Sequence, residues 1–337
     1  MTSFRYLSLA VVAILVSCSQ SPKEGKTEVA AEAIPTLTVG IQISPAMGLL
    51  MVAEDKGFFT KNRVNVTLKE FTAGKFALQA FLGGSLDMAV CGEVPVTLST
   101  LQGNKFKVIS QVVERTINEV RIVAVRDASA NGAEAFFKKK KRKLATSFGG
   151  GPEFFTYNFL KKYNIKPGDV ELISQKPEDM PAALLSGSVD AISIFDPFAR
   201  IAEMQLGKNA QTYTASDVYS ELYVAVVTDA TIQAHPEALK AFLRALKDAS
   251  VFMRENPGDS KAIVMKYTKL DPAVINGIWD NFVFKPAIND LFLKYTAAEA
   301  RWAIDTGKFP AGTATPDFTQ VLYTRLLEDV DHTLIKL

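Results

Sequence analysis

Short apolar runs alternate with amphipathic stretches over residues 36–230, an order that is typical of α/β domains. The alternating, β-rich run Thr36–Ile43 predicts a first strand, and the periodic segment Met47–Lys56 predicts the helix after it. Strand and helix patterns then follow one another as far as the predicted strand Tyr219–Thr228. From Asp229 onward the pattern is helical, and Pro236–Glu255 is its longest periodic segment.

Two stretches of the chain, Leu82–Pro95 and Leu185–Pro197, share one residue order. Each runs Gly-Ser-apolar-Asp, then an apolar run, then a carboxylate with a proline just behind it. Gly84 and Gly187 can end a helix, because glycine accepts the left-handed conformation at a C-cap. The short apolar runs are typical of buried parallel strands. Each copy therefore predicts a helix, a turn, a strand and a loop.

Each of these loops follows the carboxyl end of a predicted strand, where open α/β sheets bind ligands. One such loop in each of two lobes predicts a cleft that closes from both sides. The alternative is that two ordinary αβ units have similar turns. Asp87 and Asp190, within the repeated order, are expected to stabilise turns and to have no part in ligand binding.

The first residues have the pattern of a secretion signal, since the apolar run Leu7–Val16 follows Arg5 and is too short to span a bilayer. Leu15-Val16-Ser17-Cys18 resembles a bacterial lipobox, which implies cleavage before Cys18 and lipid attachment, with palmitate among the acyl chains. The alternative is an ordinary secretory signal with an incidental cysteine. Lipidation of Cys18 leaves Cys91 alone, as a small buried apolar residue without a disulfide partner.

The composition mainly argues against particular kinds of partner and site. The 337 residues are 48% apolar and 22% charged with a net charge of +2, so nucleic acid is not expected as a partner. His235 and His332 are far apart, so neither a metal site nor a catalytic triad is indicated, and we expect no cofactor. The basic run Lys138–Lys143 is expected to be a solvated turn or helix end, with contact to anionic headgroups as the weaker alternative.

Four segments carry a family resemblance: Ser44-Pro45-Ala46, Ala53–Phe59, Gly84–Ala89, and Val189–Pro197. Together they resemble the type II solute-binding proteins of ABC importers. The closer resemblance is to the branch that binds aliphatic sulfonates, taurine, nitrate or bicarbonate, and thiamine-pyrimidine precursors. It covers residues 36–230 well and the helical tail only loosely.

The resemblance implies a two-lobed α/β fold of the Venus-flytrap type, with two hinge-crossing strands and a helical C-terminal closure. We expect a signal peptide at 1–17, a tether at 18–34, a first lobe from 35–125 and 227–337, and a second lobe from 126–226. The hinge is expected near Val125–Asp127 and Val226–Asp229. The closed form would dock on a membrane permease that works with an ATPase.

Five loops are expected to face the cleft: Ser44–Met47, Phe71–Gly74, Gly92–Pro95, Ser147–Pro152 and Phe195–Pro197. They supply the candidate ligand-binding residues Ser44, Pro45, Ala46, Phe71, Thr72, Gly92, Glu93, Ser147, Gly149, Gly150, Phe195 and Asp196. Glu93 and Asp196 favour an amine or a hydrogen-bond-donating heterocycle, although a helix N-cap is the preferred alternative for Asp196. Hydroxyl and backbone donors at helix starts favour an anion, so a sulfonate or oxyanion is the competing ligand.

The expected function is therefore that of a monomeric, lipid-anchored binding protein of the cell envelope, facing the periplasm or the exterior. A ligand-sensing subunit is the nearest alternative. An enzyme is less favoured, because the related fold of eukaryotic pyrimidine biosynthesis implies an essential histidine and a cysteine-rich motif that this chain lacks in the expected lobe.

Overall fold

The computed structural model describes residues 34–337, apart from the side chain of Arg115. The predicted signal peptide, Cys18 and nearly all of the tether lie outside the described residues. Within residues 34–337 no helix is long and apolar enough to cross a membrane.

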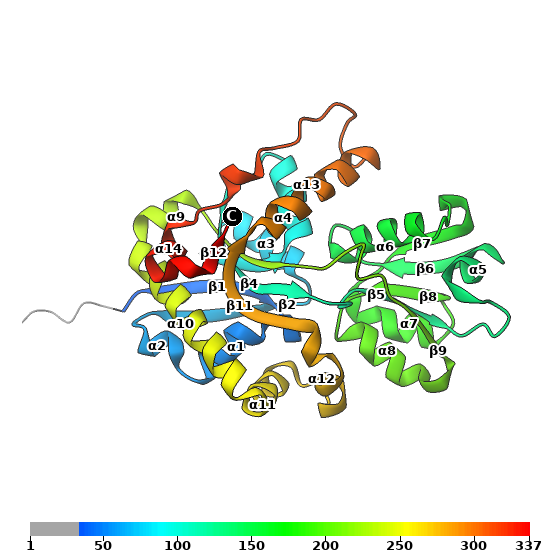
Figure 1. Ribbon diagram of the computed structural model, residues 1–337, viewed down its shortest axis with the longest axis horizontal. Helices are drawn as coiled ribbons and strands as arrows, with labels where there is room; N and C mark the ends of the chain where they lie inside the picture. The colour runs from blue at the N-terminus through cyan, green and yellow to red at the C-terminus, as the bar shows by residue number, and fades with distance from the viewer. Residues whose placement is uncertain (1–33) are drawn as a thin grey trace, which may run out of the picture. The chain divides into compact units, whose positions relative to one another are not determined.

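Residues 34–337 contain two β-sheets (Figure 1). The first has the strand order β12 (Ile335–Lys336), β11 (Phe282–Asn289), β4 (Lys107–Thr116), β10 (Tyr223–Val227), β3 (Met88–Gly92), β1 (Thr36–Gln42), β2 (Asn65–Phe71). The second has the order β7 (Val170–Ser174), β6 (Arg142–Thr146), β8 (Ala191–Ile194), β5 (Arg121–Val125), β9 (Ala210–Tyr213). We call the seven-stranded sheet with its helices the first lobe, and the five-stranded sheet with its helices the second lobe.

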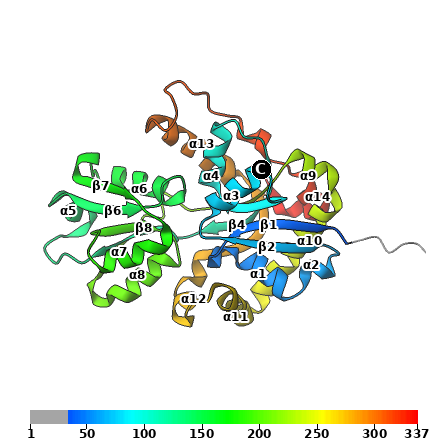
Figure 2. The same ribbon diagram turned by 180° about the vertical axis from the view of Figure 1, so that it is seen from behind.

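Helices cover both sheets. Those of the first lobe are α1 (Gly48–Asp55), α2 (Phe58–Lys61), α3 (Gly74–Leu82), α4 (Glu93–Leu101), α9 (Asp229–Ala234), α10 (Pro236–Glu255), α11 (Pro257–Thr268), α12 (Pro272–Ile278), α13 (Asp290–Asp305) and α14 (Arg325–Asp331). Those of the second lobe are α5 (Gly132–Lys138), α6 (Gly151–Lys162), α7 (Met180–Leu185) and α8 (Phe198–Leu206), grouped together in the view from behind (Figure 2).

The strand β3 shows how the first sheet is buried on both faces. Met88 and Val90 join the core made with α1 and α10, whereas Ala89 and Cys91 join the core made with α3, α4 and α13. Successive side chains of a strand point to opposite faces, so a continuous apolar run fits a sheet covered on both sides. Cys91 is fully buried here, as predicted.

The two repeated stretches form equivalent units. In each lobe one strand, β1 or β6, pairs in parallel with two neighbours, and an antiparallel strand completes each set. Gly84 and Gly187 have φ values of +77° and +76°, which confirms that these glycines end helices. The N–H groups of Ser85 and Ser188 then donate back to the carbonyl groups of Ala80 and Ala183, the same pattern in both copies.

The structure corrects the sequence analysis at the crossings between lobes. The first lobe was expected to include residues up to Val125. Strand β5 (Arg121–Val125) instead pairs with β8 and β9 and belongs to the second sheet. The connections between the sheets are therefore residues 117–120 and 214–222, and the hinge expected near Val226–Asp229 lies inside and just beyond β10. Pairing partners decide this assignment, and they are not visible in local periodicity.

The C-terminal part is also less helical than predicted. Strand β11 (Phe282–Asn289) pairs with β4, and its register shifts around Pro286. A proline within a run argues against a strand unless an irregularity accommodates it, which is why the sequence pattern missed β11. Over Pro316–Leu337, the end of the segment with a helical pattern, the structure has only the short helix α14, two 3₁₀ turns and β12.

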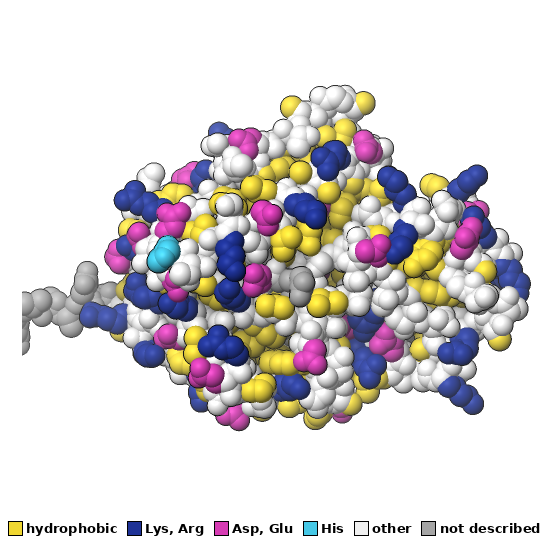
Figure 3. All heavy atoms as spheres, viewed as in Figure 1, with side chains coloured by type: hydrophobic (Ala, Val, Ile, Leu, Met, Phe, Trp, Pro, Cys, Tyr) yellow, Lys and Arg dark blue, Asp and Glu magenta, His cyan; other side chains and the backbone are white. Residues whose placement is uncertain are grey.

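The basic run differs from a simple solvated turn at one position. Arg142 begins β6, is buried, and forms ion pairs with Asp127 at 2.5 Å and Asp190 at 3.3 Å. The lysines of the run are exposed, in agreement with the prediction for them. Over the face seen in Figure 3, acidic and basic side chains are interspersed, as a net charge of +2 leads one to expect.

Candidate functional site

A small pocket lies where loops of the two lobes meet, and we call it the cleft pocket. The first lobe contributes Gln42, Ala73, Gly74, Lys75, Gly92, Pro95 and Glu221, and the second contributes Ser147, Gly150, Gly151, Pro152 and Phe195. Most of these residues follow the carboxyl ends of strands, where ligands bind in α/β folds. Glu221 lies in the crossing segment 214–222 that leads into β10.

Four residues predicted from the sequence line this pocket: Gly92, Ser147, Gly150 and Phe195. The other predicted residues do not line it. Ser44, Pro45 and Ala46 are buried at the start of the first helix, Phe71 is half-buried, and Thr72 is exposed. Gly149, with φ +80°, precedes the lining residues, and its N–H donates to the Glu153 carboxylate at 2.7 Å.

One wall of the pocket is fixed by Gln42 at the end of β1. Its amide nitrogen donates to the Ser44 hydroxyl at 2.9 Å and to the Tyr223 hydroxyl at 3.1 Å. Its amide oxygen accepts from the N–H of Gly74 at 2.9 Å. This network orients the first turn of α3, and Ser44 supports the site from behind.

Lys75, in the first turn of α3, joins the lobes. Its ammonium group donates to the Ser147 hydroxyl at 3.1 Å and to the carbonyl oxygen of Phe148 at 2.7 Å. Burial lowers the pKa of Lys75, and the charges of Glu153 and Glu178 act in the opposite direction. A cation of the protein itself therefore bridges the two lobes at the cleft pocket.

The carboxyl group of Glu221 lies between two helix starts, one from each lobe. A β-carbon on Gly92, which precedes α4, or on Gly151, which begins α6, would overlap Oε1 of Glu221. Glycine is needed at both positions because the carboxyl group comes this close. Burial, followed by the charges of Glu119 and Glu93, raises the pKa of Glu221 well above its usual range.

Glu221 and Glu119 share one hydroxyl group. The Tyr223 hydroxyl lies 3.2 Å from Oε2 of Glu221 and 3.0 Å from Oε1 of Glu119, and it already accepts from Gln42. One hydroxyl carries one proton, so it can donate to only one of the two carboxyl groups. The arrangement is therefore one donor short unless a carboxyl group is protonated, and the pKa of Glu119 is indeed raised, first of all by burial.

A second carboxyl pair lies behind the pocket. Glu93 accepts from the N–H of Leu222 at 2.8 Å, and Glu299 accepts from the Thr97 hydroxyl at 2.6 Å. The two carboxyl groups interact, and burial raises the pKa of Glu93 to about 7 and that of Glu299 well above its usual range. Two facing carboxyl groups in a dry site are stable when they share a proton. Glu93, predicted as a ligand residue, thus supports the loop that carries Gly92.

Asp196 is neither a lining residue of the cleft pocket nor a helix N-cap. Its carboxylate forms two hydrogen bonds with Arg121, at 2.9 and 3.0 Å, and Arg121 also contacts Glu203 at 2.7 Å. Pro197 occupies the N-cap position of α8, so the N-cap preferred for Asp196 is wrong. Asp196 also accepts from Asn281 of the first lobe at 3.3 Å. It is therefore a structural ion-pair residue at the contact between the lobes.

Sequence reasoning missed Gln42, Lys75 and Glu221 as lining residues. Gly151 lies inside the expected loop Ser147–Pro152, although it was not among the candidate residues, and Lys75 lies one position beyond the expected loop Phe71–Gly74. Glu221 had no local signal, because it lies in a predicted strand and reaches the cleft only through the crossing of the chain. Within residues 34–337, no group of His, Cys, Asp and Glu side chains is arranged to hold a metal ion.

The comparisons with known proteins fit this geometry. A profile of the NMT1-like family matches residues 30–266. The chain belongs to the NMT1-like family. Among the relatives of this chain, a putative aliphatic sulfonates-binding protein of Bacillus subtilis is 25% identical over 278 residues, covering 81% of this chain and 80% of the relative. The taurine-binding periplasmic protein of Escherichia coli is 23% identical over 226 residues, covering 66% and 67%.

Solved structures confirm the predicted fold class. The periplasmic aliphatic sulphonate binding protein SsuA from Escherichia coli superposes with a TM-score of 0.74 at 20% identity, covering 87% of this chain and 98% of that one. The periplasmic nitrate-binding protein NrtA from Synechocystis PCC 6803 gives a TM-score of 0.73 at 16% identity, covering 90% and 89%. The resemblance read from the sequence, to the sulfonate, taurine, nitrate and thiamine-precursor branch, is thereby confirmed.

Proposed function

We propose that this protein is the substrate-binding lipoprotein of an ABC importer, and that it captures a small polar solute between its two lobes and delivers it to a membrane permease. The observation that carries the proposal is the cleft pocket, whose walls come from strand-end loops of both lobes. The relatives named above are binding proteins by their descriptions. The lobes would turn about residues 117–120 and 214–222, and a solute that contacts both would favour the closed form.

The solute that fits best is one that donates hydrogen bonds, such as an amine or an amino-substituted heterocycle. Glu221 lines the pocket, and the Tyr223 hydroxyl offers one proton to two carboxyl groups, so the Glu221–Tyr223–Glu119 group is one donor short when both carboxyl groups are ionised. A donor on the solute would supply that missing hydrogen bond. A buried acceptor left without a donor costs about 1–3 kcal/mol, so satisfying it contributes to affinity and selectivity.

An anionic solute such as an alkanesulfonate is the second candidate. Lys75 lines the pocket, and the N-terminus of α6, a helix of 12 residues, opens into it at Gly150–Pro152. Both features favour a negative charge. Glu221 opposes this candidate, because its carboxyl group occupies the space beside Gly92 and Gly151 at the two helix starts.

A binding panel with one variant separates the two candidates. Titration calorimetry of the full chain with aminopyrimidines, flavin-like rings, amines, alkanesulfonates, taurine and nitrate should give heat for one class. For a donor-type solute, we expect Glu221→Gln to weaken binding by about tenfold or more, through loss of a buried acceptor. For an anion, the same variant should leave affinity unchanged or improve it.

The matched control is Glu134→Gln, since Glu134 is exposed on α5 and, among the residues that the structure describes, forms an ion pair with Lys138 alone. It should not change either result. Absence of heat with every class at millimolar solute would contradict an importer role with these solutes and favour a sensor with another ligand.

The envelope location forms a separate part of the proposal. Cys18 would carry the lipid and residues 18–34 would act as the tether, at the membrane surface facing the periplasm or the exterior. Mass spectrometry of the protein purified from bacterial membranes should show an acylated peptide that begins at Cys18. The variant Cys18→Ser should release the protein from the membrane fraction, and a membrane-bound Cys18→Ser protein would contradict the anchor.

A further inference from the structure

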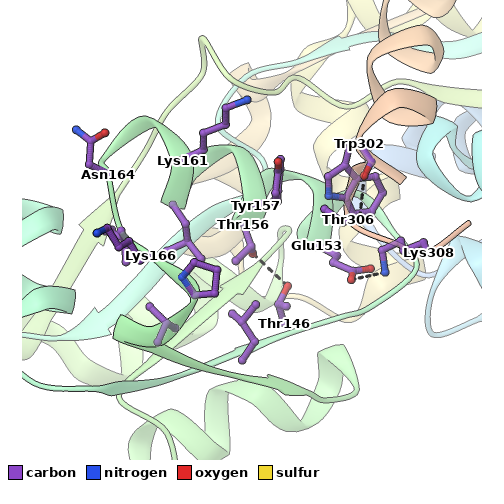
Figure 4. Close-up of a pocket in the computed structure, with 15 residues that line it drawn as sticks. Thr146, Glu153, Thr156, Tyr157, Lys161, Asn164, Lys166, Trp302, Thr306 and Lys308 are labelled. Carbon is purple, nitrogen blue, oxygen red and sulfur yellow. Dashed lines mark hydrogen bonds and ion pairs between the residues drawn. The ribbon is translucent and has the colours of Figure 1, made fainter. Parts of the chain in front are cut away.

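A second and larger cavity, of about 730 Å³, lies beside α6 in the second lobe and shares no lining residue with the cleft pocket. Its wall is formed by α6, the loop after it, strand β7 and the end of β6, with Trp302, Thr306 and Lys308 from the first lobe (Figure 4). We call it the α6 cavity. Its volume falls within the range of small-molecule sites, about 300–1,000 Å³.

The body of the α6 cavity is apolar. Its apolar lining consists of Tyr157, Leu160, Ile165, Pro167, Val170, Leu172 and Trp302. Leu172 is 44% exposed although it lies in the strand β7. The hydroxyl groups of Thr146 and Thr156, which also line the cavity, are already used: Thr146 donates to Ser193 O at 3.0 Å and Thr156 to Pro152 O at 2.7 Å. These threonines therefore do not demand a polar ligand.

One end of the cavity is aromatic and electrically balanced. The rings of Tyr157 and Trp302 lie 6.5 Å apart between centroids. Beside them Glu153 is neutralised by Lys308 at 2.5 Å, and Lys308 lies over the Trp302 ring at 5.3 Å (Figure 4). The Glu153 carboxylate also accepts a hydrogen bond from the N–H of Gly149, so both of its oxygens already have partners in the protein.

The remaining charged groups of the lining are both positive. Lys161 and Lys166 are exposed, and within residues 34–337 no acidic side chain forms an ion pair with either of them. Lys166 lies at the end away from Trp302 (Figure 4). An apolar body with unpaired cations at its rim is complementary to a molecule that has an apolar chain or ring and one anionic head.

We propose that the α6 cavity is a second binding site and that it takes an amphiphilic carboxylate, with the apolar part against Leu172 and Trp302 and the carboxylate near Lys161 and Lys166. This site is independent of the proposed solute of the cleft. It also contacts both lobes, because Trp302 and Lys308 belong to the segment of α13 and beyond, whereas the rest belongs to the second lobe.

Fluorescence tests this proposal directly. The chain has two tryptophans, so Trp279→Phe leaves Trp302 as the single donor of energy transfer. The probe is 11-(dansylamino)undecanoate, titrated into the full chain that carries this substitution. We expect saturable dansyl emission on excitation of Trp302, displacement by decanoate, and at least tenfold weaker displacement by decylamine.

Two sets of variants locate the site. Leu172→Glu places a negative charge on the apolar wall and should weaken probe binding at least tenfold. Its matched control is Leu185→Glu, because Leu185 is 55% exposed on the same lobe and does not line the cavity. The pair Lys161→Ala and Lys166→Ala should weaken the carboxylate probe about three- to tenfold and leave the affinity of the amine unchanged.

The proposal is overturned by any of three results: no saturable emission, equal displacement by decanoate and decylamine, or equal losses for Leu172→Glu and Leu185→Glu. Leu172, Leu185, Lys161 and Lys166 are exposed, and Trp279→Phe and Glu221→Gln keep an aromatic ring and an isosteric side chain at their positions, so each variant should fold, and circular dichroism checks this. Glu221→Gln should leave probe binding unchanged. A loss of probe binding in Glu221→Gln would place the probe in the cleft and would also overturn the proposal.

Discussion

Asp87 and Thr38 exchange two hydrogen bonds. The N–H of Asp87 donates to the carbonyl oxygen of Thr38 at 3.0 Å, and the N–H of Thr38 donates to the Asp87 carboxylate at 2.8 Å. Asp190 and Lys143 repeat the exchange in the second lobe, at 3.0 and 2.9 Å. The aspartate of each repeated stretch thus ties the start of its strand to the neighbouring parallel strand, β1 or β6, as expected for residues that stabilise turns.

Removal of this tie should destabilise the first lobe. Asp87→Ala leaves the N–H of Thr38 without its acceptor, so we expect a loss of about 1–2 kcal/mol in the free energy of unfolding. Asp87→Asn keeps an acceptor oxygen and should lose less than half of that. Urea unfolding followed by circular dichroism measures both, and equal losses for the two variants would contradict the role of the hydrogen bond.

The buried carboxyl groups predict a stability that falls as pH rises. In the folded protein burial raises the pKa of Glu93 to about 7, while the unfolded chain has the ordinary value of 4.5. Between these values the unfolded state releases its proton and the folded state keeps it, so the stabilisation present below pH 4.5 is lost as pH rises through 7. Glu119, Glu221 and Glu299 act in the same direction.

Calorimetry from pH 5 to pH 8 should therefore show a falling unfolding temperature. The pKa shift of Glu93 alone should lower the free energy of unfolding by about 3 kcal/mol, since one pKa unit corresponds to about 1.4 kcal/mol. The isosteric variant Glu93→Gln cannot titrate and should make the fall in unfolding temperature smaller. A profile that rises over this range would show that the buried carboxyl groups are ionised in the folded protein, and a profile that Glu93→Gln leaves unchanged would show that Glu93 does not contribute to the fall.

Gly92 and Gly151 should not tolerate a methyl group. A β-carbon at either position overlaps the Glu221 carboxyl group, and at Gly151 also the Tyr219 hydroxyl, so we expect each alanine variant to lose about 1–3 kcal/mol. Gly168→Ala is the control, because its β-carbon would meet nothing within 4 Å. Thermal unfolding compares them. The double variant Gly92→Ala with Glu221→Ala should recover part of the loss, and no recovery would contradict the overlap.

The ion pair between Arg121 and Asp196 should be costly to break. Their side chains are only 7% and 0% exposed, so Arg121→Met leaves Asp196 buried without its cation. We expect a loss of about 3–5 kcal/mol in urea unfolding. The exposed pair of Lys61 and Asp248 is the comparison, and Lys61→Met should lose less than about 1 kcal/mol. Similar losses for the two variants would show that burial does not govern the effect.

The repeated stretches were predictable because their information is local. Helix ends at Gly84 and Gly187, and apolar strands after them, follow from backbone freedom and periodicity within a dozen residues. The membership of β5 in the second sheet follows instead from pairing with β8 and β9, far along the chain. Glu221 shows the same limit for the site, since it reaches Gly92 and Gly151 only after the chain has crossed between the lobes twice.

The bond from Lys75 to the Ser147–Phe148 loop also gives the protein a natural place for an optical reporter. Phe148 is 37% exposed at this junction, whereas Cys91, the one cysteine among residues 34–337, is fully buried with a raised thiol pKa. With Cys18 acylated as proposed, a dye attached to Phe148→Cys would therefore label the rim of the cleft and leave Cys91 unmodified. The emission of the dye would change when the Ser147–Phe148 loop separates from Lys75. One substitution would therefore make opening of the cleft visible by fluorescence.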